Sequence, residues 1–183
     1  MALLLISGGV RSGKSRTAVQ LASGQDRPVH FLATAEGRDR DMEERIAHHQ
    51  SERPPSWATI EEPLRLREML IEVPLDDCLV IDCLNLWTSN SLEHFDPLEI
   101  EHQAYKASRI AAKRVGHTIV VTNEVGLGVV PTNDLARVFV DLLGRVNTTW
   151  AEVADHMILM IAGRALSLTS TSLPWEPLND SAR

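Results

Sequence analysis

Short runs of apolar residues alternate along this chain with longer segments in which apolar residues recur every three or four positions. A short apolar run is typical of a buried strand, and the longer spacing is typical of a helix with one face on the core. The runs predict strands near residues 2–7, 29–33, 79–83, 117–122 and 157–161, with an edge strand at 165–168. The spacing predicts helices over residues 16–22, 39–50, 64–72, 97–115 and 133–154. This alternation predicts an α/β fold with a mostly parallel central sheet and helices on both faces.

The same pattern predicts one compact unit. No repeat, low-complexity segment or long linker interrupts it, so a single domain is expected over residues 1–170. Residues 171–183 contain two prolines and are expected to form a flexible tail. Gly144 falls inside the last predicted helix, where a bend or a break is expected because glycine weakens a helix interior.

Composition restricts the class of protein. The chain has 183 residues, 44% of them hydrophobic and 23% charged, and a net charge of −7, which together indicate an ordinary soluble globular protein and argue against nucleic acid as a partner. Cys78 and Cys83 lack metal-site spacing and are expected to be buried free thiols in a reducing compartment. No basic leader precedes the first apolar run, and no apolar stretch approaches the ~18 residues of a membrane span. A cytoplasmic location without a membrane span is therefore expected.

The first predicted strand leads into a glycine-rich segment with the pattern G-x-x-x-x-G-K-S, which is the P-loop pattern. In a P-loop the glycines let backbone N–H groups approach phosphate oxygens, Lys14 reaches the β- and γ-phosphates, and the Ser15 hydroxyl binds Mg²⁺. The alternative is a glycine turn that ends in Lys-Ser by chance. A strand before the turn and a helix after it favour the P-loop, so the fold is predicted to be P-loop NTPase-like. The expected nucleotide-binding residues here are Gly8, Gly9, Val10, Arg11, Ser12, Gly13, Lys14 and Ser15.

An acidic residue ends another of the apolar runs. Asp82 closes the run that begins at Cys78, as the carboxylate of a Walker B strand does, and Ser15 and Asp82 are the predicted Mg²⁺ ligands. The alternative is a polar residue that only marks the end of the strand. Because the carboxyl ends of parallel strands meet at one edge of a sheet, the P-loop, residues 34–36, Asp82 and residues 123–128 are expected to surround one crevice.

The motifs together resemble one family, the bifunctional adenosylcobinamide kinase/adenosylcobinamide-phosphate guanylyltransferases of cobalamin biosynthesis. The resemblance extends to about Leu168. It rests on the P-loop, Ala33-Thr34-Ala35, Arg45-Ile46-Ala47-His48-His49, Arg53-Pro54 with Trp57, Thr59-Ile60-Glu61-Glu62-Pro63, residues 122–131 and Gly144-Arg145-Val146-Asn147.

This resemblance implies two reactions. The first moves a γ-phosphate from ATP or GTP to the aminopropanol hydroxyl of adenosylcobinamide. The second moves GMP from GTP onto that phosphate through a GMP-histidine intermediate and yields adenosylcobinamide-GDP. The R-I-x-x-H pattern of the family falls on Arg45, Ile46 and His49, so the resemblance assigns His49 as the nucleophile in preference to His48. Neighbours on a helix point about 100° apart, so only one of the two histidines can face the phosphate. Apart from the resemblance, a His-His pair on a polar helix would be interpreted as two solvated side chains.

The remaining site residues are expected to hold nucleotide. Lys14 and Asp82 join His49 as the catalytic residues. Arg11 could contact a phosphate or be a surface charge, and Glu61 could accept hydrogen bonds from guanine or ribose, with Glu62 as its structural alternative. The other expected contacts are Thr34, Ala35, Glu36, Gln50, Ser51, Glu52 and Arg53. The resemblance also implies a homo-oligomer with the nucleotide site near a subunit boundary, and the apolar residues 129–131 are a candidate interface.

Two other functions fit a P-loop. One is a small-molecule kinase in which His49 has no role, and the other is a regulatory NTPase that changes partners on hydrolysis. No N-K-x-D sequence follows a predicted strand, since Asn123 is followed by Glu124 and Val125, and this counts against a conventional GTPase switch. The sequence leaves open whether both activities are retained, whether ATP or GTP is the preferred donor, and which residues bind the corrinoid.

Overall fold

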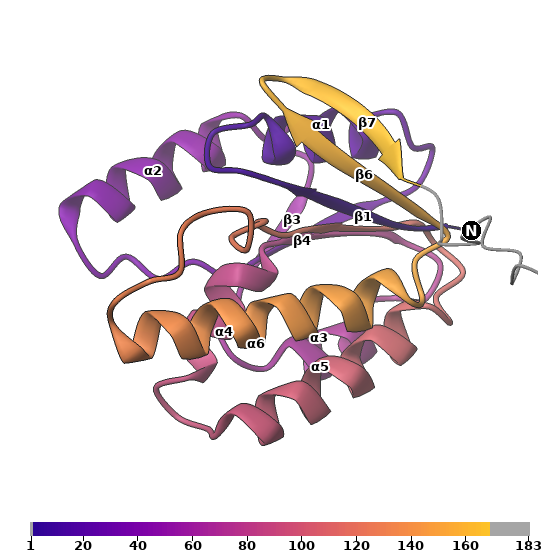
Figure 1. Ribbon diagram of the computed structural model, residues 1–183. Helices are drawn as coiled ribbons and strands as arrows, with labels where there is room; N and C mark the ends of the chain where they lie inside the picture. Colours follow the sequence, from indigo (N-terminus) through magenta and orange to yellow (C-terminus); the bar gives the residue numbers. More distant parts are fainter. Residues whose placement is uncertain (1, 169–183) are drawn as a thin grey trace, which may run out of the picture.

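The computed structural model describes residues 2–168, which form one three-layer α/β domain (Figure 1). The predicted tail at 171–183 lies outside the described residues. The strands are β1 (Leu3–Gly8), β2 (Val29–Ala33), β3 (Ala58–Glu61), β4 (Cys78–Asp82), β5 (Thr118–Val121), β6 (His156–Ile161) and β7 (Arg164–Leu168). The helices are α1 (Lys14–Ser23), α2 (Arg40–Ser51), α3 (Leu66–Glu72), α4 (Leu84–Ser91), α5 (Pro97–Ala111) and α6 (Asp134–Ala151).

Within the described residues, seven strands form one sheet in the order β3-β2-β4-β5-β1-β6-β7. Every neighbouring pair is parallel except β6 and β7, which form an antiparallel hairpin at one edge. The predicted mostly parallel sheet is therefore confirmed. Because the parallel strands all end at the same edge, the loops that follow them gather on one side of the molecule.

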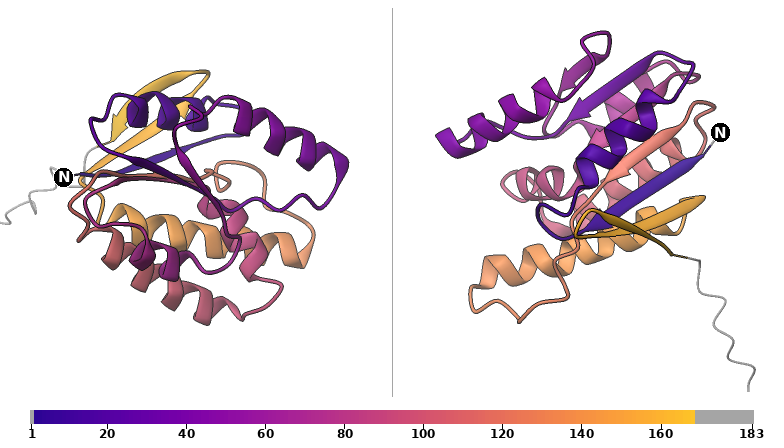
Figure 2. Two further views of the ribbon diagram at one scale, coloured as in Figure 1. Left: turned by 180° about the vertical axis from the view of Figure 1, so that it is seen from behind. Right: turned by 90° about the horizontal axis from the view of Figure 1, so that it is seen from above.

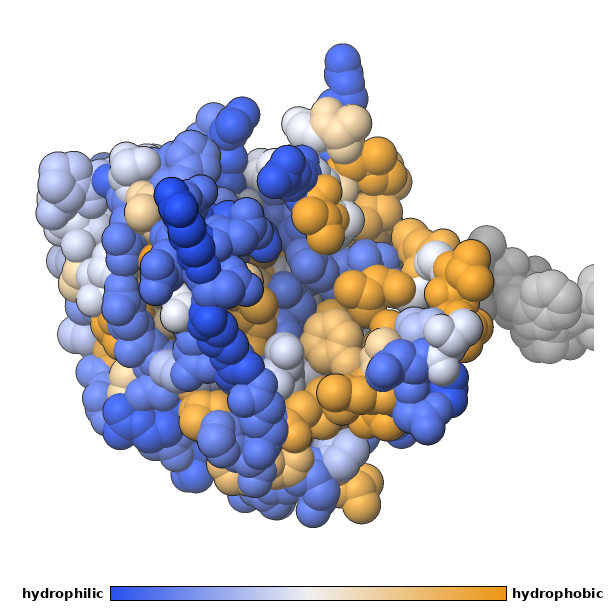
Figure 3. All heavy atoms as spheres, turned by 90° about the vertical axis from the view of Figure 1, so that its left-hand side faces the viewer, coloured by the Kyte–Doolittle hydropathy of each residue, from blue (hydrophilic) through white to orange (hydrophobic). Residues whose placement is uncertain are grey.

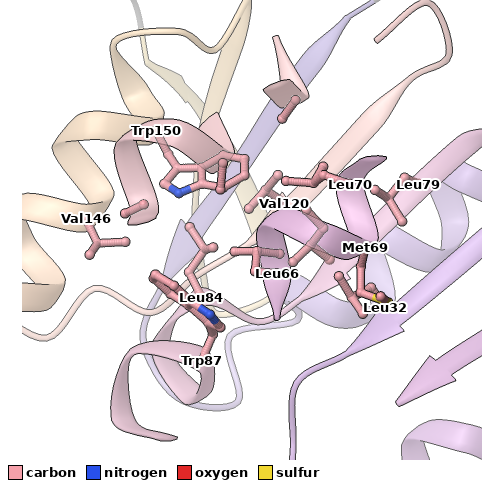
Figure 4. Packing of buried hydrophobic residues seen from close by; sticks show 14 of the residues in the cluster. Leu32, Leu66, Met69, Leu70, Leu79, Leu84, Trp87, Val120, Val146 and Trp150 are labelled. Atoms are coloured by element: carbon pink, nitrogen blue, oxygen red, sulfur yellow. The ribbon is translucent and has the colours of Figure 1, made fainter. Parts of the chain in front are cut away.

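Helices cover both faces of the sheet, as predicted. On one face α3, α4, α5 and α6 pack on the larger hydrophobic cluster, in which Trp87 and Trp150 are fully buried (Figure 4). On the other face α1 packs through Ala18 and Ala22 on a smaller cluster. Helix α2 lies on the α1 side and extends from one corner of the molecule (Figure 2). None of the residues of α2 is buried.

Two elements were missed by the sequence analysis. Strand β3 lies at the edge of the sheet, where only Ile60 is even half-buried, so it lacks an apolar run. Helix α4 buries the polar residues Thr88, Asn90 and Ser91, so it lacks the alternation of apolar and polar faces. A helix that packs polar side chains inward has no helical signature in hydrophobicity.

Other boundaries differ from the predictions. The expected break at Gly144 is wrong, because α6 runs unbroken across it. Gly144 is exposed, and the turns on either side of it are held by the buried Leu142, Leu143, Val146 and Trp150. Helix α5 ends at Ala111 instead of reaching Val115.

Both cysteines are free and buried, as expected. No helix in the described part of the chain is long and apolar enough to cross a membrane.

Candidate active site

A cavity of about 1040 Å³ opens at the edge of the sheet where the parallel strands end. The P-loop, the inner face of α2, the end of β4 and residues from the ends of β3 and β5 line it. Figure 3 views the molecule from this side and shows the hollow, with hydrophilic side chains gathered along one flank and hydrophobic ones along the other. Segments that are far apart in the sequence therefore share one site.

Most of the predicted site residues lie on the wall of this cavity. Those that line it are Val10, Arg11, Ser12, Gly13, Lys14, Ser15, Ala35, Glu36, His49, Gln50, Glu52, Arg53, Glu61 and Asp82. Those that do not are Gly8, Gly9, Thr34 and Ser51. Of the predicted segment 123–128, only Asn123 reaches the wall, so the expectation that the whole segment surrounds the crevice is wrong.

Two of the P-loop glycines, Gly8 and Gly13, are required by the backbone of the loop. Gly8 and Gly13 have φ angles of 150° and 98°, which disfavour a side chain. A Cβ on Gly8 would also lie 2.4 Å from the carbonyl oxygen of Met160, so β1 can approach β6 closely only with glycine at this position. Gly13 caps the N-terminus of α1, which begins at Lys14. The loop therefore places a helix N-terminus at the cavity, as anion binding requires.

Lys14 is held over the P-loop. Its Nζ donates a hydrogen bond to the carbonyl of Gly9 at 2.6 Å, and the residue is 7% exposed. Burial lowers the pKa of the Lys14 ammonium, and the nearby Cys83 and Asp82 oppose that shift. The ammonium thus sits partly desolvated beside the carboxylate at the end of β4, where its attraction for phosphate oxygens is stronger than in water.

Thr34 fixes the end of β4 from behind the cavity wall. Its hydroxyl accepts a hydrogen bond from the N–H of Cys83 at 2.8 Å and donates one to the carbonyl of the same residue at 2.7 Å. The N–H of Thr34 donates to the carbonyl of Asp82 at 3.0 Å. Thr34 is fully buried, and these bonds occupy its side chain, so it supports the segment that carries Asp82.

Helix α2 carries two adjacent histidines. Met42, Ile46 and His49 are the only residues of α2 that are not exposed, and all three line the cavity. The His49 side chain is 37% exposed and that of His48 is 70% exposed. Glu52 lies beside both, with an oxygen 3.5 Å from His49 Nδ1 and another 3.8 Å from His48 Nε2. Both rings reach the cavity wall, and His49 is the more enclosed.

The paired glutamates after β3 have different environments. Glu61 lines the cavity and accepts a hydrogen bond from the side chain of Gln50 at 2.8 Å. Glu62 instead binds the backbone N–H groups of Leu64 and Arg65 and the Arg65 guanidinium. Burial alone would raise the pKa of Glu62, but these donors outweigh it and the pKa lies below its ordinary value. Glu62 therefore stabilises the turn into α3, whereas Glu61 is the glutamate that faces the site.

Arg53 places a partly desolvated guanidinium on the cavity wall. Its Nε and Nη1 are buried and have no hydrogen-bond partner among the described residues. Burial lowers the pKa of Arg53, and the charges of Asp82 and Glu61 oppose that shift. A buried donor without a partner is costly, so this group is suited to bind an anion that enters the cavity.

Further residues line the cavity that the sequence analysis did not assign. Asn85 lies in the first turn of α4, three residues after Asp82, and its Oδ1 is buried without a partner among the described residues. Its helix has no hydrophobic signature, so nothing in the sequence marks it. Arg16 and Arg45 also line the cavity. The sequence could have indicated them, because Arg16 directly follows the P-loop and Arg45 is the first residue of the R-I-x-x-H pattern.

Ser15 and Asp82 offer oxygen ligands that suit a hard cation whose other ligands are phosphate and water oxygens. The described residues contain no cluster of three or more histidine, cysteine, aspartate or glutamate side chains that could hold a metal by itself. Ser15 and Asp82 both line the cavity and offer a hydroxyl and a carboxylate oxygen. Mg²⁺ is commonly bound through one or two such groups plus substrate phosphates, so these residues fit it.

Comparison with known proteins identifies the family. The sequence matches the family described as cobinamide kinase / cobinamide phosphate guanyltransferase over residues 4–168. The chain belongs to this family. Its P-loop, the α2 histidines and the Glu61-Glu62 pair all lie within the matched region.

Three relatives of the cobinamide kinase/guanyltransferase family match nearly full length. The bifunctional adenosylcobalamin biosynthesis protein CobP of Pseudomonas aeruginosa is 39% identical over 92% of this chain and 98% of its own length. The CobU proteins of Escherichia coli and Salmonella typhimurium are 35% and 37% identical over 88% of this chain and 96% of their own lengths.

Two solved structures are similar to this chain in fold only. A KaiC-like protein of Pyrococcus horikoshii OT3 gives a TM-score of 0.52 at 17% identity and covers 86% of this chain and 70% of its own. Another protein of that organism, PH0250, gives a TM-score of 0.57 at 7% identity and covers 93% and 87%. Both likenesses concern the fold alone and agree with the α/β architecture described above.

Proposed function

We propose that the protein phosphorylates adenosylcobinamide on its aminopropanol hydroxyl and then transfers GMP from GTP to that phosphate, which yields adenosylcobinamide-GDP. One observation carries the proposal for this chain beyond its family membership. A single cavity is lined both by the P-loop and by the face of α2 that presents His49. Phosphate binding and a nucleophilic side chain therefore share one site, as two successive transfers from nucleoside triphosphates require.

The kinase step uses the P-loop. The substrate hydroxyl forms a bond to Pγ of ATP or GTP, the bond from Pγ to the β,γ-bridging oxygen breaks, and the hydroxyl proton is released with the nucleoside diphosphate. Lys14 stabilises the negative charge of the transferring group from its partly desolvated position. Ser15 and Asp82 would hold Mg²⁺, which when bound neutralises phosphate charge.

The guanylyltransferase step uses His49. A ring nitrogen forms a bond to Pα of GTP and pyrophosphate leaves. A phosphate oxygen of adenosylcobinamide phosphate then forms a bond to Pα as the P–N bond breaks. Support for His49 over His48 comes from its place beside Met42 and Ile46 and its lower exposure. The Glu52 carboxylate 3.5 Å from Nδ1 favours the proton there, which leaves Nε2 free to attack.

Glu61 is proposed to recognise guanine or ribose. It faces the cavity, and a carboxylate can accept two hydrogen bonds from the N–H groups of guanine. Gln50 holds it in place. Glu62 is excluded from this role because the turn into α3 occupies both of its oxygens.

We also propose a homo-oligomer. Leu127, Val129 and Val130 are 84%, 96% and 73% exposed beside one another, an apolar surface typical of an interface. Sedimentation should show an oligomer for the wild type and a smaller particle for Val129→Asp. A wild-type monomer at working concentration would contradict this.

The proposed function is tested by separating the products by mass. Wild type with adenosylcobinamide and ATP should form the monophosphate, and addition of GTP should convert it to the GDP derivative with release of pyrophosphate. Lys14→Ala should form monophosphate about a hundredfold more slowly, since it loses a charged donor to the transition state. Lys113→Ala, an exposed lysine away from the cavity, is the control and should retain full activity. A wild type that forms neither product overturns the proposal.

A further inference from the structure

Asn147 links helix α6 to the end of β5. It is the last residue of the Gly-Arg-Val-Asn motif, to which neither reaction above assigns a role. Its side chain is buried, and Oδ1 accepts a hydrogen bond from the Thr122 hydroxyl at 2.6 Å. Its Nδ2 donates to the carbonyl of Asn123 at 3.0 Å. One side chain therefore holds two successive residues just past the strand.

The end of β5 lies between the two strands that carry the phosphate chemistry. Val121 is the register partner of Ile6 on the P-loop strand and of Asp82 on β4. Beyond Val121 the chain continues along the P-loop strand, because the N–H of Thr122 donates to Ile6 at 2.9 Å and that of Glu124 donates to Gly8 at 3.1 Å. Asn123, between these two bonds, thus lies between the start of the P-loop and Asp82.

Asn123 lies on the wall of the cavity that is proposed to hold the nucleotide. It lines the cavity, and in the described part of the chain no hydrogen bond engages its side-chain amide. Its backbone carbonyl is turned away to Asn147. A neutral amide can donate to a phosphoryl oxygen and accept from a hydroxyl, so it can orient both reacting groups without adding charge.

We infer that Asn123 is a catalytic residue of the kinase reaction, with its amide on the transferring γ-phosphoryl group, and that Asn147 is the positioning residue that aims it. The inference rests on the proposed kinase function. If Asn147 only satisfied buried polar groups, its loss would cost stability and leave the chemical step alone. If it acts through Asn123, its effect on kcat disappears once Asn123 has no amide.

A double-mutant cycle separates these two roles. Asn123→Ala should lower kcat for adenosylcobinamide phosphorylation about a hundredfold with KM for ATP changed less than about threefold, as loss of one transition-state donor does. Asn147→Ala should lower kcat about tenfold. The double variant should be no slower than Asn123→Ala alone.

Asn133→Ala is the matched control. Asn133 caps the other end of the same helix through the N–H of Ala136, so its loss lowers the melting temperature without touching the end of β5. It should retain wild-type kcat. If Asn147→Ala does not fold, Asn147→Asp gives the same cycle, because it keeps the acceptor for Thr122 and removes the donor that holds Asn123.

Three results would each contradict a different part of the inference. Wild-type kcat in Asn123→Ala overturns the role of Asn123. A tenfold effect of Asn147→Ala that persists in the Asn123→Ala background overturns the positioning role. A wild type that makes no adenosylcobinamide phosphate overturns the proposed function, and this inference with it.

Discussion

The guanidinium of Arg53 lies over the ring of Phe31, with its central carbon 3.6 Å from the ring centre. Trp57 stacks on the same ring at a centroid distance of 6.4 Å. Phe31 is fully buried in β2, so the sheet itself fixes where the guanidinium sits. The stack holds a cation on the cavity wall just after the helix that carries His49.

Replacement of Arg53 by lysine keeps the charge but loses the planar group that stacks and donates in two directions. Arg53→Lys should lower kcat/KM for GMP transfer by about 10- to 100-fold, the equivalent of one to two charged hydrogen bonds. Steady-state kinetics with adenosylcobinamide phosphate and GTP measure this. Arg40→Lys on the exposed face of α2 is the control. Equal losses in both variants would show that the Phe31 stack has no special role.

Glu62 makes stability depend on pH. Its pKa is lower in the folded protein than its ordinary value of 4.5, so its stabilising contribution is present above that value and is lost as pH falls through the folded pKa. Glu62→Gln should therefore lower the free energy of unfolding by about 1 kcal/mol near neutral pH, with the difference vanishing in acid. Urea unfolding across the pH range measures it. Glu72→Gln, exposed at the end of α3, should show no such trend. A difference that persists unchanged in acid would contradict this account.

Arg114 organises the opposite end of the sheet. It is 1% exposed, and it donates to the carbonyls of Val73, Pro74 and Asp77 at 2.9–3.0 Å. Burial lowers the pKa of Arg114, and Asp77 opposes that shift.

Arg114→Ala should lower the free energy of unfolding by about 3 kcal/mol, because it leaves these carbonyls unsatisfied. The melting temperature should fall by roughly 10 °C. Specific activity of the folded fraction should stay near wild type, since Arg114 lies away from the cavity. Lys113→Ala is the neighbouring control. A melting temperature within about 2 °C of wild type would refute this role.

The sheet could be predicted because its central strands are buried on both faces. Residues 78–82 read as one apolar run that ends in an acid, and the structure has the strand over those residues. Edge strand β3 could not be predicted, since solvent leaves its side chains free to be polar. Gly144 shows that packing on either side of a glycine overrides its local preference.

The site could be predicted where its residues are contiguous. The P-loop is a local structure, and its sequence pattern is sufficient to find it. The position of Thr34 depends instead on Cys83, 49 residues away, and the polar bonds between them leave no trace in hydrophobicity. Only the direction of each side chain shows which of Glu61 and Glu62 faces the cavity, because neighbours in an extended segment point to opposite sides.

The central claim is that the cavity lined by the P-loop also contains the nucleophile His49. The most direct measurement is incubation with GTP labelled at the α-phosphate, followed by detection of acid-labile, base-stable label on the protein. We expect label on wild type and on His48→Ala and none on His49→Ala. Label that survives in His49→Ala would contradict the assignment, and a wild type that takes no label would leave only the kinase reaction.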